Sequence, residues 1–141
     1  MIRAVLDANV LVSGLISKKG TPGRLIDAWL EGQFQLCISP QIMDELSRVL
    51  KYPRIIERLE KRQAEALLKN LSALAEWVDG QITLEVLTLD PSDNIYLACA
   101  VEAQCDYLVT GNSDHFREAG SKYKGVEIIS PRGFMDVLSL E

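Results

Sequence analysis

The sequence has few residues that could build a zinc site or a disulfide framework. It contains one histidine and three cysteines, an odd count in which no two cysteines have the C-x-x-C spacing. The single histidine, His115, completes no familiar zinc pattern with them. We therefore expect Cys37, Cys99 and Cys105 to be buried thiols in the reduced state.

Long hydrophobic runs are also missing. The longest apolar stretch, residues 8–16, is interrupted by Asn9, Ser13 and Gly14 and is too short to span a bilayer. The N-terminus does not show the basic region, apolar core and cleavage site of a signal peptide in that order. These features predict a cytoplasmic protein.

The chain has fewer basic than acidic residues. Its net charge of −5 argues against a protein that holds nucleic acid by bulk electrostatic attraction, although a local basic rim is compatible with it. With 141 residues, 48% of them hydrophobic and 25% charged, it has the composition of an ordinary globular domain. No repeat or linker divides it, so we expect a single domain over residues 1–141.

Hydrophobic patterns alternate between strands and helices along the chain. Short apolar runs predict strands at residues 2–6, 35–38, 82–89, 107–109 and 126–129. Apolar residues at helical spacing, several behind a capping residue or a proline, predict helices at residues 21–31, 39–50, 55–59, 62–78 and 91–104 and from residue 131. This alternation predicts an α/β fold whose central, mainly parallel five-stranded sheet is covered by helices on both faces.

Carboxylates follow several of the predicted strands. Asp7 comes after the first strand, Asp90 and Asp93 after the third, and Asp114 shortly after the fourth. Glu45 flanks the apolar stripe of its helix when residues are placed 100° apart, and that helix begins at the carboxyl end of the second strand. Because ligands bind at the carboxyl ends of parallel strands, we expect these side chains to meet at one edge of the sheet.

Each carboxylate also has an ordinary structural explanation. Asp90 and Asp93 match an N-cap and a capping-box-like acid around a first-turn proline, and Asp7 and Asp114 could cap the segments that follow them. Glu45 could be a helix-edge surface residue. Together, however, converging carboxylates would raise one another's pKa unless a divalent cation neutralised them. Oxygen ligands predict Mg²⁺ or Mn²⁺, one or two ions, and such sites suit hydrolysis of phosphate esters by an activated water.

Four segments resemble the acidic motifs of the PIN domain family. They are VLDANVLVSGL around Asp7, SPQIMDELSRVL around Glu45, DPSDNIYLACAVEAQCDYLVTGN around Asp93, and the TGNSDHF that follows. The motifs stand in the family's order and cover nearly the whole chain. Among PIN proteins, the chain most resembles the VapC-like toxins of bacterial and archaeal toxin–antitoxin pairs.

The resemblance implies a three-layer α/β/α sandwich and a metal-dependent endoribonuclease that leaves a 5′-phosphate. Carried over by position, it makes Asp7, Glu45 and Asp93 the metal ligands. It also assigns polar groups that orient the ligands or the substrate, namely Asn9, Ser39, Thr110 and Asn112. A cognate antitoxin protein and an RNA substrate are the implied partners, and the long apolar helix suggests a homodimer.

One position departs from the family pattern. PIN proteins often have aspartate directly after Thr-Gly, where this chain has Asn112, and Asp114 stands two residues later. If Asp114 substitutes, the site keeps four acids; otherwise the second metal is in doubt. His115 adjoins this acid, and we do not expect it to be a general base, because the metal itself can supply hydroxide.

Basic residues could hold RNA beside the acidic centre. They form two clusters, one after the first motif and one after the Glu45 helix: Lys18, Lys19 and Arg24, and Lys51, Arg54, Arg58, Lys61 and Arg62. The alternative for the second cluster is an ordinary set of solvated helix faces.

Proteins of other kinds also carry acidic groups at the edge of a parallel sheet. A receiver-type signalling domain would need a lysine after the fifth strand, which here ends in IISPRG. A hydrolase that forms an aspartyl-phosphate would show two aspartates one residue apart, whereas Asp7-Ala8-Asn9 offers one. A catalytically silent PIN fold that serves as a binding module, with the acids kept as caps, is the remaining alternative.

Overall fold

A six-stranded sheet forms the centre of the computed structural model, which describes residues 1–139. The strands are β1 (Arg3–Leu6), β2 (Gln35–Ile38), β3 (Glu76–Trp77), β4 (Tyr107–Val109), β5 (Lys122–Tyr123) and β6 (Val126–Ile129). Their order is β3-β2-β1-β4-β6-β5, and only the edge strand β5 runs antiparallel to its neighbour within the described residues. Five parallel strands therefore place their carboxyl ends at one edge.

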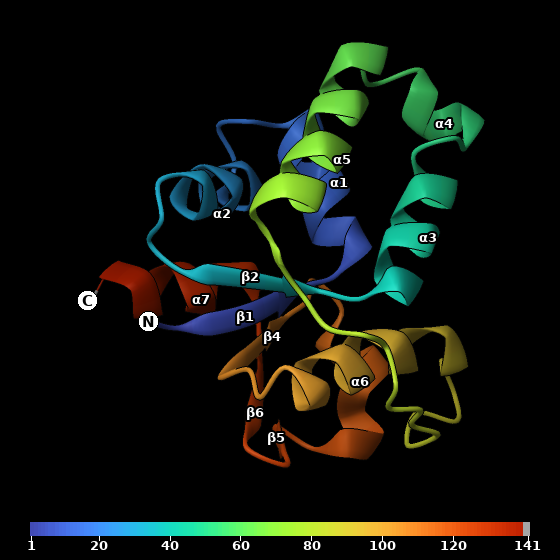
Figure 1. Cartoon of the computed structure of the whole chain (residues 1–141), viewed down its shortest axis with the longest axis vertical. Coiled ribbons are helices and arrows are strands. Elements are labelled where there is room, and N and C mark those ends of the chain that lie inside the picture. The colour runs from blue at the N-terminus through green and yellow to red at the C-terminus, as the bar shows by residue number, and fades with distance from the viewer. Residues whose placement is uncertain (140–141) are drawn as a thin grey trace.

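Helices cover the sheet on both faces. They are α1 (Ala8–Ile16), α2 (Thr21–Leu30), α3 (Pro40–Val49), α4 (Pro53–Ile56), α5 (Lys61–Leu74), α6 (Asn94–Glu102) and α7 (Pro131–Ser139), with 3₁₀ helices η1 (Pro91–Asp93) and η2 (Ser113–Ala119). Figure 1 shows α1, α2 and α5 on one face of the sheet and α6 on the other. The α/β fold with a mainly parallel central sheet is confirmed.

The central strand β1 is buried on both faces. Ala4, Val5 and Leu6 are almost completely inaccessible to solvent, because helices pack above and below them. At the opposite end of the core, the rings of Phe34 and Phe134 meet edge to face with centroids 5.0 Å apart. An apolar strand without alternation is what a doubly covered parallel sheet requires.

The strand expected at residues 82–89 is wrong. This segment is extended. Its residues alternate between half-buried and exposed from Ile82 to Val86, and Leu87 is buried, but the backbone pairs with side chains instead of another strand. The strand beside β2 is β3, within the stretch expected to be helical at residues 62–78, so α5 ends at Leu74. Alternation of apolar and polar residues thus indicates an extended backbone, but it does not show whether that backbone pairs with another strand.

Helix α1 is a second difference, because the apolar stretch 8–16 had no assigned element. Its glycine allows close packing on α2: a Cβ at Gly14 would lie 2.9 Å from the carbonyl oxygen of Pro22. The side chain of Asp7 caps the helix by accepting a hydrogen bond from the Val10 backbone N–H. A strand and a helix therefore follow each other directly, with the carboxylate at the junction.

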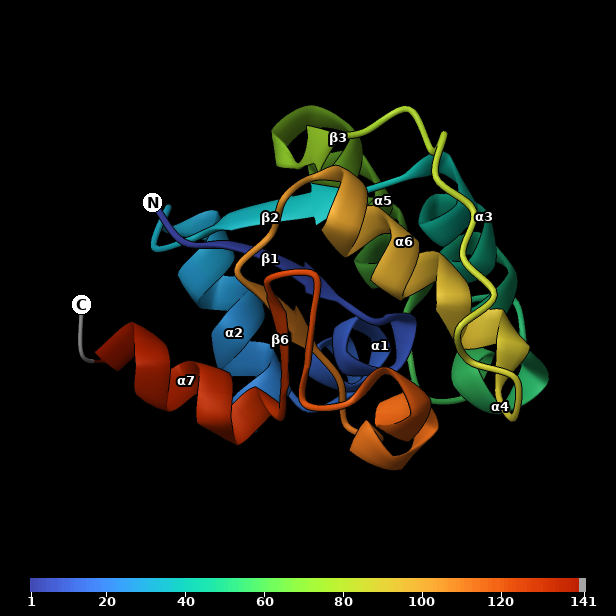
Figure 2. The same cartoon turned by 90° about the horizontal axis from the view of Figure 1, so that it is seen from below.

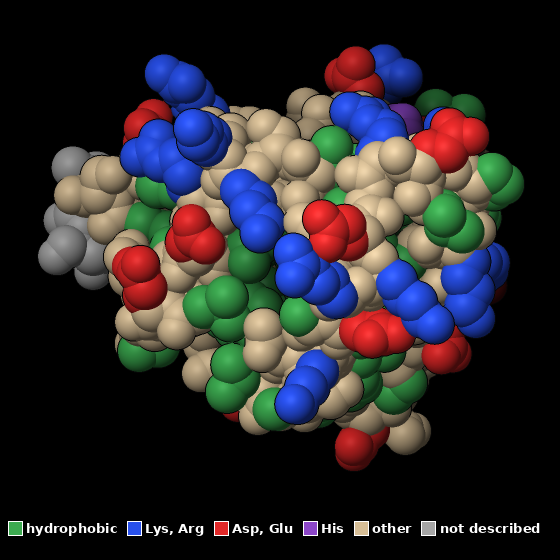
Figure 3. All heavy atoms as spheres, turned by 90° about the horizontal axis from the view of Figure 1, so that it is seen from above, with side chains coloured by type: hydrophobic (Ala, Val, Ile, Leu, Met, Phe, Trp, Pro, Cys, Tyr) green, Lys and Arg blue, Asp and Glu red, His purple; other side chains and the backbone are tan. Residues whose placement is uncertain are grey.

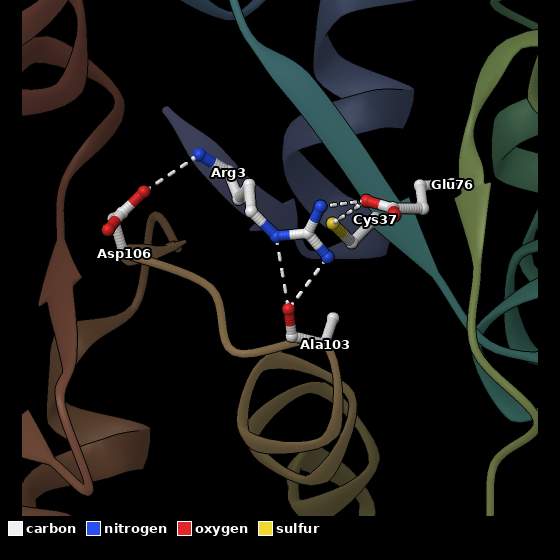
Figure 4. A network of polar contacts seen from close by, with 5 residues as sticks. All are labelled: Arg3, Cys37, Glu76, Ala103 and Asp106. Carbon is white, nitrogen blue, oxygen red and sulfur yellow. Dashed lines mark hydrogen bonds and ion pairs between the residues drawn. The ribbon is translucent and has the colours of Figure 1, made fainter. Parts of the chain in front are cut away.

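Arg3 ties three elements together at the amino end of the strands. Figure 4 shows its guanidinium paired with Glu76 on β3 and donating to the carbonyl oxygen of Ala103, where α6 ends. The Arg3 backbone N–H donates to the Asp106 carboxylate at 2.9 Å. This network holds the edge strand β3 and the end of α6 far from the carboxyl edge of the sheet.

The cysteines are free and buried, as expected. Burial raises the pKa of Cys99 to about 12, so this thiol stays protonated. Within residues 1–139, no helix combines the length and apolar character needed to cross a bilayer.

Candidate metal centre

Asp7 is held rigidly at the carboxyl end of β1. Its backbone N–H donates to the Val109 carbonyl oxygen at 3.1 Å, and its Oδ1 accepts from the Val10 N–H at 2.9 Å. The side chain is buried, and burial raises the pKa of this carboxyl. Hydrogen bonds from Thr110 and Val10 oppose this rise, whereas the charge of Asp93 adds to it.

A pocket of about 190 Å³ opens beside Asp7. It is lined by residues from the start of α1, from α3, from the η1–α6 junction and from η2. Its lining is mostly polar: Asp7, Ala8, Asn9, Glu45, Val49, Asp90, Ser92, Asp93, Tyr96 and His115. Four carboxyl groups from three separate chain segments thus face one small space.

Asp90, Asp93 and His115 form the tightest group in this pocket. Each offers one possible ligand atom, and these atoms lie within 4.8 Å of one another. His115 Nδ1 lies 2.9 Å from Asp93 Oδ2. Burial raises the pKa of Asp93, the imidazole partly reverses this, and the charges of Asp90 and Glu45 raise it further. The carboxylates therefore repel one another, as a site built for a cation would require.

Glu45 reaches the pocket from α3. Its side chain is 27% exposed and forms an ion pair with Arg48, one turn further along the helix, at 3.2 Å. Arg48 itself is largely exposed, so this pair neutralises only the outer side of the acidic cluster. The expected orientation of Glu45 toward the other carboxylates is what the structure shows.

Tyr96 supplies a hydroxyl to the floor of the pocket. Burial raises its pKa well above the ordinary value, and the charges of Asp7, Glu45 and Asp93 raise it further. A hydrogen bond from the backbone N–H of Ala8 acts in the opposite direction. The phenol therefore stays protonated and keeps a proton to donate toward an oxygen in the pocket.

The remaining residues expected at the site lie in different places. Thr110 is buried against Asp7, and its hydroxyl also accepts from the Asn112 backbone N–H at 3.0 Å. Ser39 caps α3 through the Ile42 N–H at 3.3 Å and lines a separate cavity. Asn112 and Asp114 are both exposed, and neither lines the pocket that contains Asp7. Asn9 stands at the pocket's exposed rim.

Two groups in the pocket, His115 and Tyr96, were not expected there from the sequence. Of the two interpretations of Asp90, the structure favours a place at the shared edge, because its side chain makes no capping hydrogen bond on η1 and lines the pocket. The usable signal for Asp90 was its spacing of three residues from Asp93, which places both on one side of a helical turn.

An extended segment, residues 78–90, carries Asp90 to the site. Figure 2 shows it running alongside α6. Three side chains pin its backbone: Glu102 accepts from two N–H groups, Asn94 both donates to and accepts from Leu87, and Glu118 accepts from Thr88 and Leu89. Because Glu118 belongs to η2, this short helix holds both the segment before Asp90 and His115.

Basic residues are spread widely over the helical face above the sheet. Figure 3 shows Lys and Arg side chains in several groups on this face, with acidic groups between them. The side chains named as possible RNA contacts are all exposed: Lys18, Lys19, Arg24, Lys51 and Arg54. Others in the second cluster have acidic partners, Arg62 with Glu60 and Lys61 with Glu65.

The donor set fits a hard divalent cation. Carboxylate oxygens predominate, one imidazole nitrogen lies among them, and no buried thiol is within the pocket lining. Mg²⁺ and Mn²⁺ are the ions that such oxygen-rich sites favour.

Comparison with known proteins agrees with this arrangement. The chain is 26% identical over 114 residues to the uncharacterized protein MJ1680 of Methanocaldococcus jannaschii, a match that spans 80% of this chain and 72% of that protein. Its structure is similar to the crystal structure of PAE2754 from Pyrobaculum aerophilum, with a TM-score of 0.60 over 99% of this chain and 91% of the other. At 18% identity, that likeness shows the fold alone. The PIN domain matches residues 3–114, most of the chain, so the protein belongs to the PIN domain family, whose members are generally metal-dependent nucleases.

Proposed function

We propose that this protein is a metal-dependent endoribonuclease that hydrolyses RNA phosphodiesters at the acidic pocket. The observation that carries the proposal is the convergence of Asp7, Glu45, Asp90 and Asp93 on a space of about 190 Å³. Burial raises the pKa of both Asp7 and Asp93, and neighbouring carboxylates add to the rise, Asp93 for Asp7 and Asp90 and Glu45 for Asp93. A bound divalent cation would relieve this repulsion.

Asp7, Glu45 and Asp93 are the proposed ligands for Mg²⁺ or Mn²⁺, one or two ions. Asp114, exposed on η2, is the family-based alternative for a fourth acid. When bound, the cation would supply Lewis acidity for attack of water on the phosphorus and offset the charge of the leaving oxygen.

The protein's own groups would fix the geometry of this reaction. Thr110 and the Val10 N–H hold the Asp7 carboxylate in one orientation, so it needs no rearrangement when the substrate arrives. Tyr96 keeps its proton and can donate it to an oxygen in the pocket. Asn9, at the exposed rim, is placed to contact the incoming strand together with Asn112.

RNA would approach the pocket with its phosphates bound by exposed basic side chains. We assign this role to Lys18, Lys19 and Arg24 in one cluster and to Lys51 and Arg54 in the other. Such contacts read the phosphate backbone and carry no base specificity, so the substrate is single-stranded or structured RNA of unspecified sequence.

The biological setting that we propose is a toxin–antitoxin pair in the cytoplasm. The proposed partners are a cognate antitoxin protein and a second copy of this chain. Exposed apolar side chains on α4 and α5 support an interface there. Ile56 is 58% exposed and lines a groove of about 440 Å³ between α3, α4 and α5, and Leu74, at the end of α5, is 53% exposed.

The test is cleavage of labelled RNA by the purified protein in Mn²⁺ or Mg²⁺, in chelator, and by an Asp7→Asn, Asp93→Asn double variant. A matched control, Asp79→Asn with Asp136→Asn, removes the same number of exposed negative charges away from the pocket. We expect metal-dependent cutting by the wild type and the control, and none by the double variant. Equal cutting by the double variant would show a contaminating nuclease.

The alternative is a PIN fold that binds RNA without cutting it. The observation in its favour is that neither Asn112 nor Asp114 lines the pocket, so the family's fourth acidic position contributes no carboxylate there. Metal-dependent RNA binding without cleavage, measured by filter retention, would support this alternative.

A further inference from the structure

His115 is the one nitrogen donor that lines the acidic pocket of the described chain. We propose that its imidazole binds the divalent cation directly, beside Asp90 and Asp93, and that the site therefore prefers Mn²⁺ to Mg²⁺. The proposal rests on the metal-dependent function proposed above, and it names two ligands and an ion preference that the family's acidic motifs do not supply.

The distances suit a shared ion. Two neighbouring ligands of an octahedral ion, each 2.0–2.1 Å from it, are about 3 Å apart, and two opposite ligands are about 4.2 Å apart. His115 Nδ1 and Asp93 Oδ2 are separated by 2.9 Å, which matches the first spacing. The whole group with Asp90 lies within 4.8 Å, so side-chain adjustments of a few tenths of an ångström would bring all three onto one ion.

The fold holds the imidazole in place. His115 follows the first turn of η2, where its backbone N–H donates to the Asn112 carbonyl oxygen at 3.0 Å. The next residue, Phe116, is fully buried, so its anchoring turns His115 toward the pocket. Two residues later, Glu118 binds the backbone just before Asp90. The same short helix therefore positions both proposed ligands.

The ligand set explains the ion preference. Mg²⁺ binds oxygen ligands, demands near-ideal octahedral geometry and gives up its waters reluctantly. Imidazole nitrogen favours transition metals, whereas carboxylates suit Mn²⁺ and Mg²⁺ alike. A site with several carboxylates and one imidazole should thus bind Mn²⁺ more tightly than Mg²⁺, and the difference should depend on the nitrogen.

A supporting role is the competing explanation for the same contact. The His115 ring could donate its proton to Asp93 and orient that carboxylate without touching the ion. Direct ¹⁴N coupling in the wild type separates the two roles, because an imidazole that only donates to Asp93 does not bind the ion. In the His115→Asn variant the amide nitrogen can still donate to Asp93, whereas the ring nitrogen that would bind the ion is gone.

The experiment measures Mn²⁺ binding to the full chain by the EPR signal of free Mn²⁺, with Mg²⁺ affinity from competition. Pulsed EPR of the bound ion then reports whether a ¹⁴N nucleus is directly coupled. Variants are His115→Asn, Asp90→Asn and Asp7→Asn, and exposed Ser113→Ala, on the same helix as His115, is the matched control.

We expect ¹⁴N coupling in the wild type and in Ser113→Ala, and its loss in His115→Asn. Because His115→Asn keeps the donor to Asp93 and loses the ring nitrogen, the Mn²⁺ dissociation constant should rise by about tenfold or more, with a smaller change for Mg²⁺. Asp90→Asn should weaken both ions.

Asp7-dependent Mn²⁺ binding without ¹⁴N coupling would overturn this inference and leave the nuclease proposal standing. The ¹⁴N result comes from the wild type, so it does not depend on any variant folding. No Mn²⁺ binding by the wild type would overturn both.

Discussion

Replacing Asp7 with asparagine should separate the stability of the fold from the binding of metal. Asp7 is buried, with 4% of its surface exposed, and it lies near the charge of Asp93. Its own negative charge is therefore unfavourable in the folded protein without metal. Asparagine keeps an oxygen that accepts from the Val10 N–H, and it caps helices as well as aspartate does. In chelator, the Asp7→Asn variant should therefore melt at the wild-type temperature or above it.

The expected sizes follow from the cap and from mass action. Removing the cap with Asp7→Ala should cost about 1 kcal/mol relative to Asp7→Asn, or roughly 3 °C for a chain of this length. Metal at a hundred times its dissociation constant stabilises the wild type by about 2.7 kcal/mol, roughly 9 °C on the same scale. Neither Asp7 variant should show that rise.

Differential scanning calorimetry in chelator and in Mn²⁺ measures all of these quantities. If Asp7→Asn melted more than about 3 °C below the wild type in chelator, the charge would be net stabilising and the reasoning would fail. If Asp7→Asn kept the full rise with Mn²⁺, Asp7 would not be a ligand. Asp79→Asn, an exposed aspartate away from the pocket, is the control.

Three further predictions concern pH and distant contacts. The pKa of Asp7 is higher in the folded protein than in the unfolded chain, so the protonated carboxyl stabilises the fold fully below its unfolded pKa of about 3.9. This stabilisation is lost as pH rises through the raised pKa. In chelator, the melting temperature of Asp7→Asn minus that of the wild type should therefore grow as pH rises over this range. Glu118→Gln should speed amide exchange in residues 88–89 and weaken Mn²⁺ binding by about tenfold; unchanged exchange would show that Glu118 does not hold the segment. Arg3→Met should cost roughly 2 kcal/mol in unfolding free energy, because it breaks the network in Figure 4, yet leave Mn²⁺ affinity unchanged in calorimetric titration.

Several elements could be predicted because their cause is local. The strands at residues 35–38, 107–109 and 126–129 are short apolar runs between turn residues, and helix α3 begins at a Ser-Pro pair that caps it. Residues 82–89, by contrast, alternate like a strand and form none. Their alternation is real, but it arises because one side of an extended chain lies on α6, and the hydrogen bonds that decide the structure come from Asn94 and Glu102.

The positions of Asp7, Glu45 and Asp93 were likewise predictable, since one follows a strand, one lies at a defined angle on a helix and one begins a helix at the same edge. The sequence did not predict that Asp90 and His115 meet. Asp90 follows an extended segment and His115 stands on a short 3₁₀ helix, and neither has an apolar periodicity long enough to show where its side chain points.

The sequence by itself therefore determined most of the strands and helices, that the carboxyl ends of the parallel strands share an edge, and that this edge carries carboxylates. Only the tertiary structure decided which side chains meet there. The physical reason is that Asp90 and His115 are placed by contacts between residues far apart in the chain. Glu118 on η2 accepts hydrogen bonds from the backbone N–H groups of Thr88, 30 residues away, and Leu89, 29 residues away. These contacts bring the segment before Asp90 and the short helix that carries His115 to the same pocket.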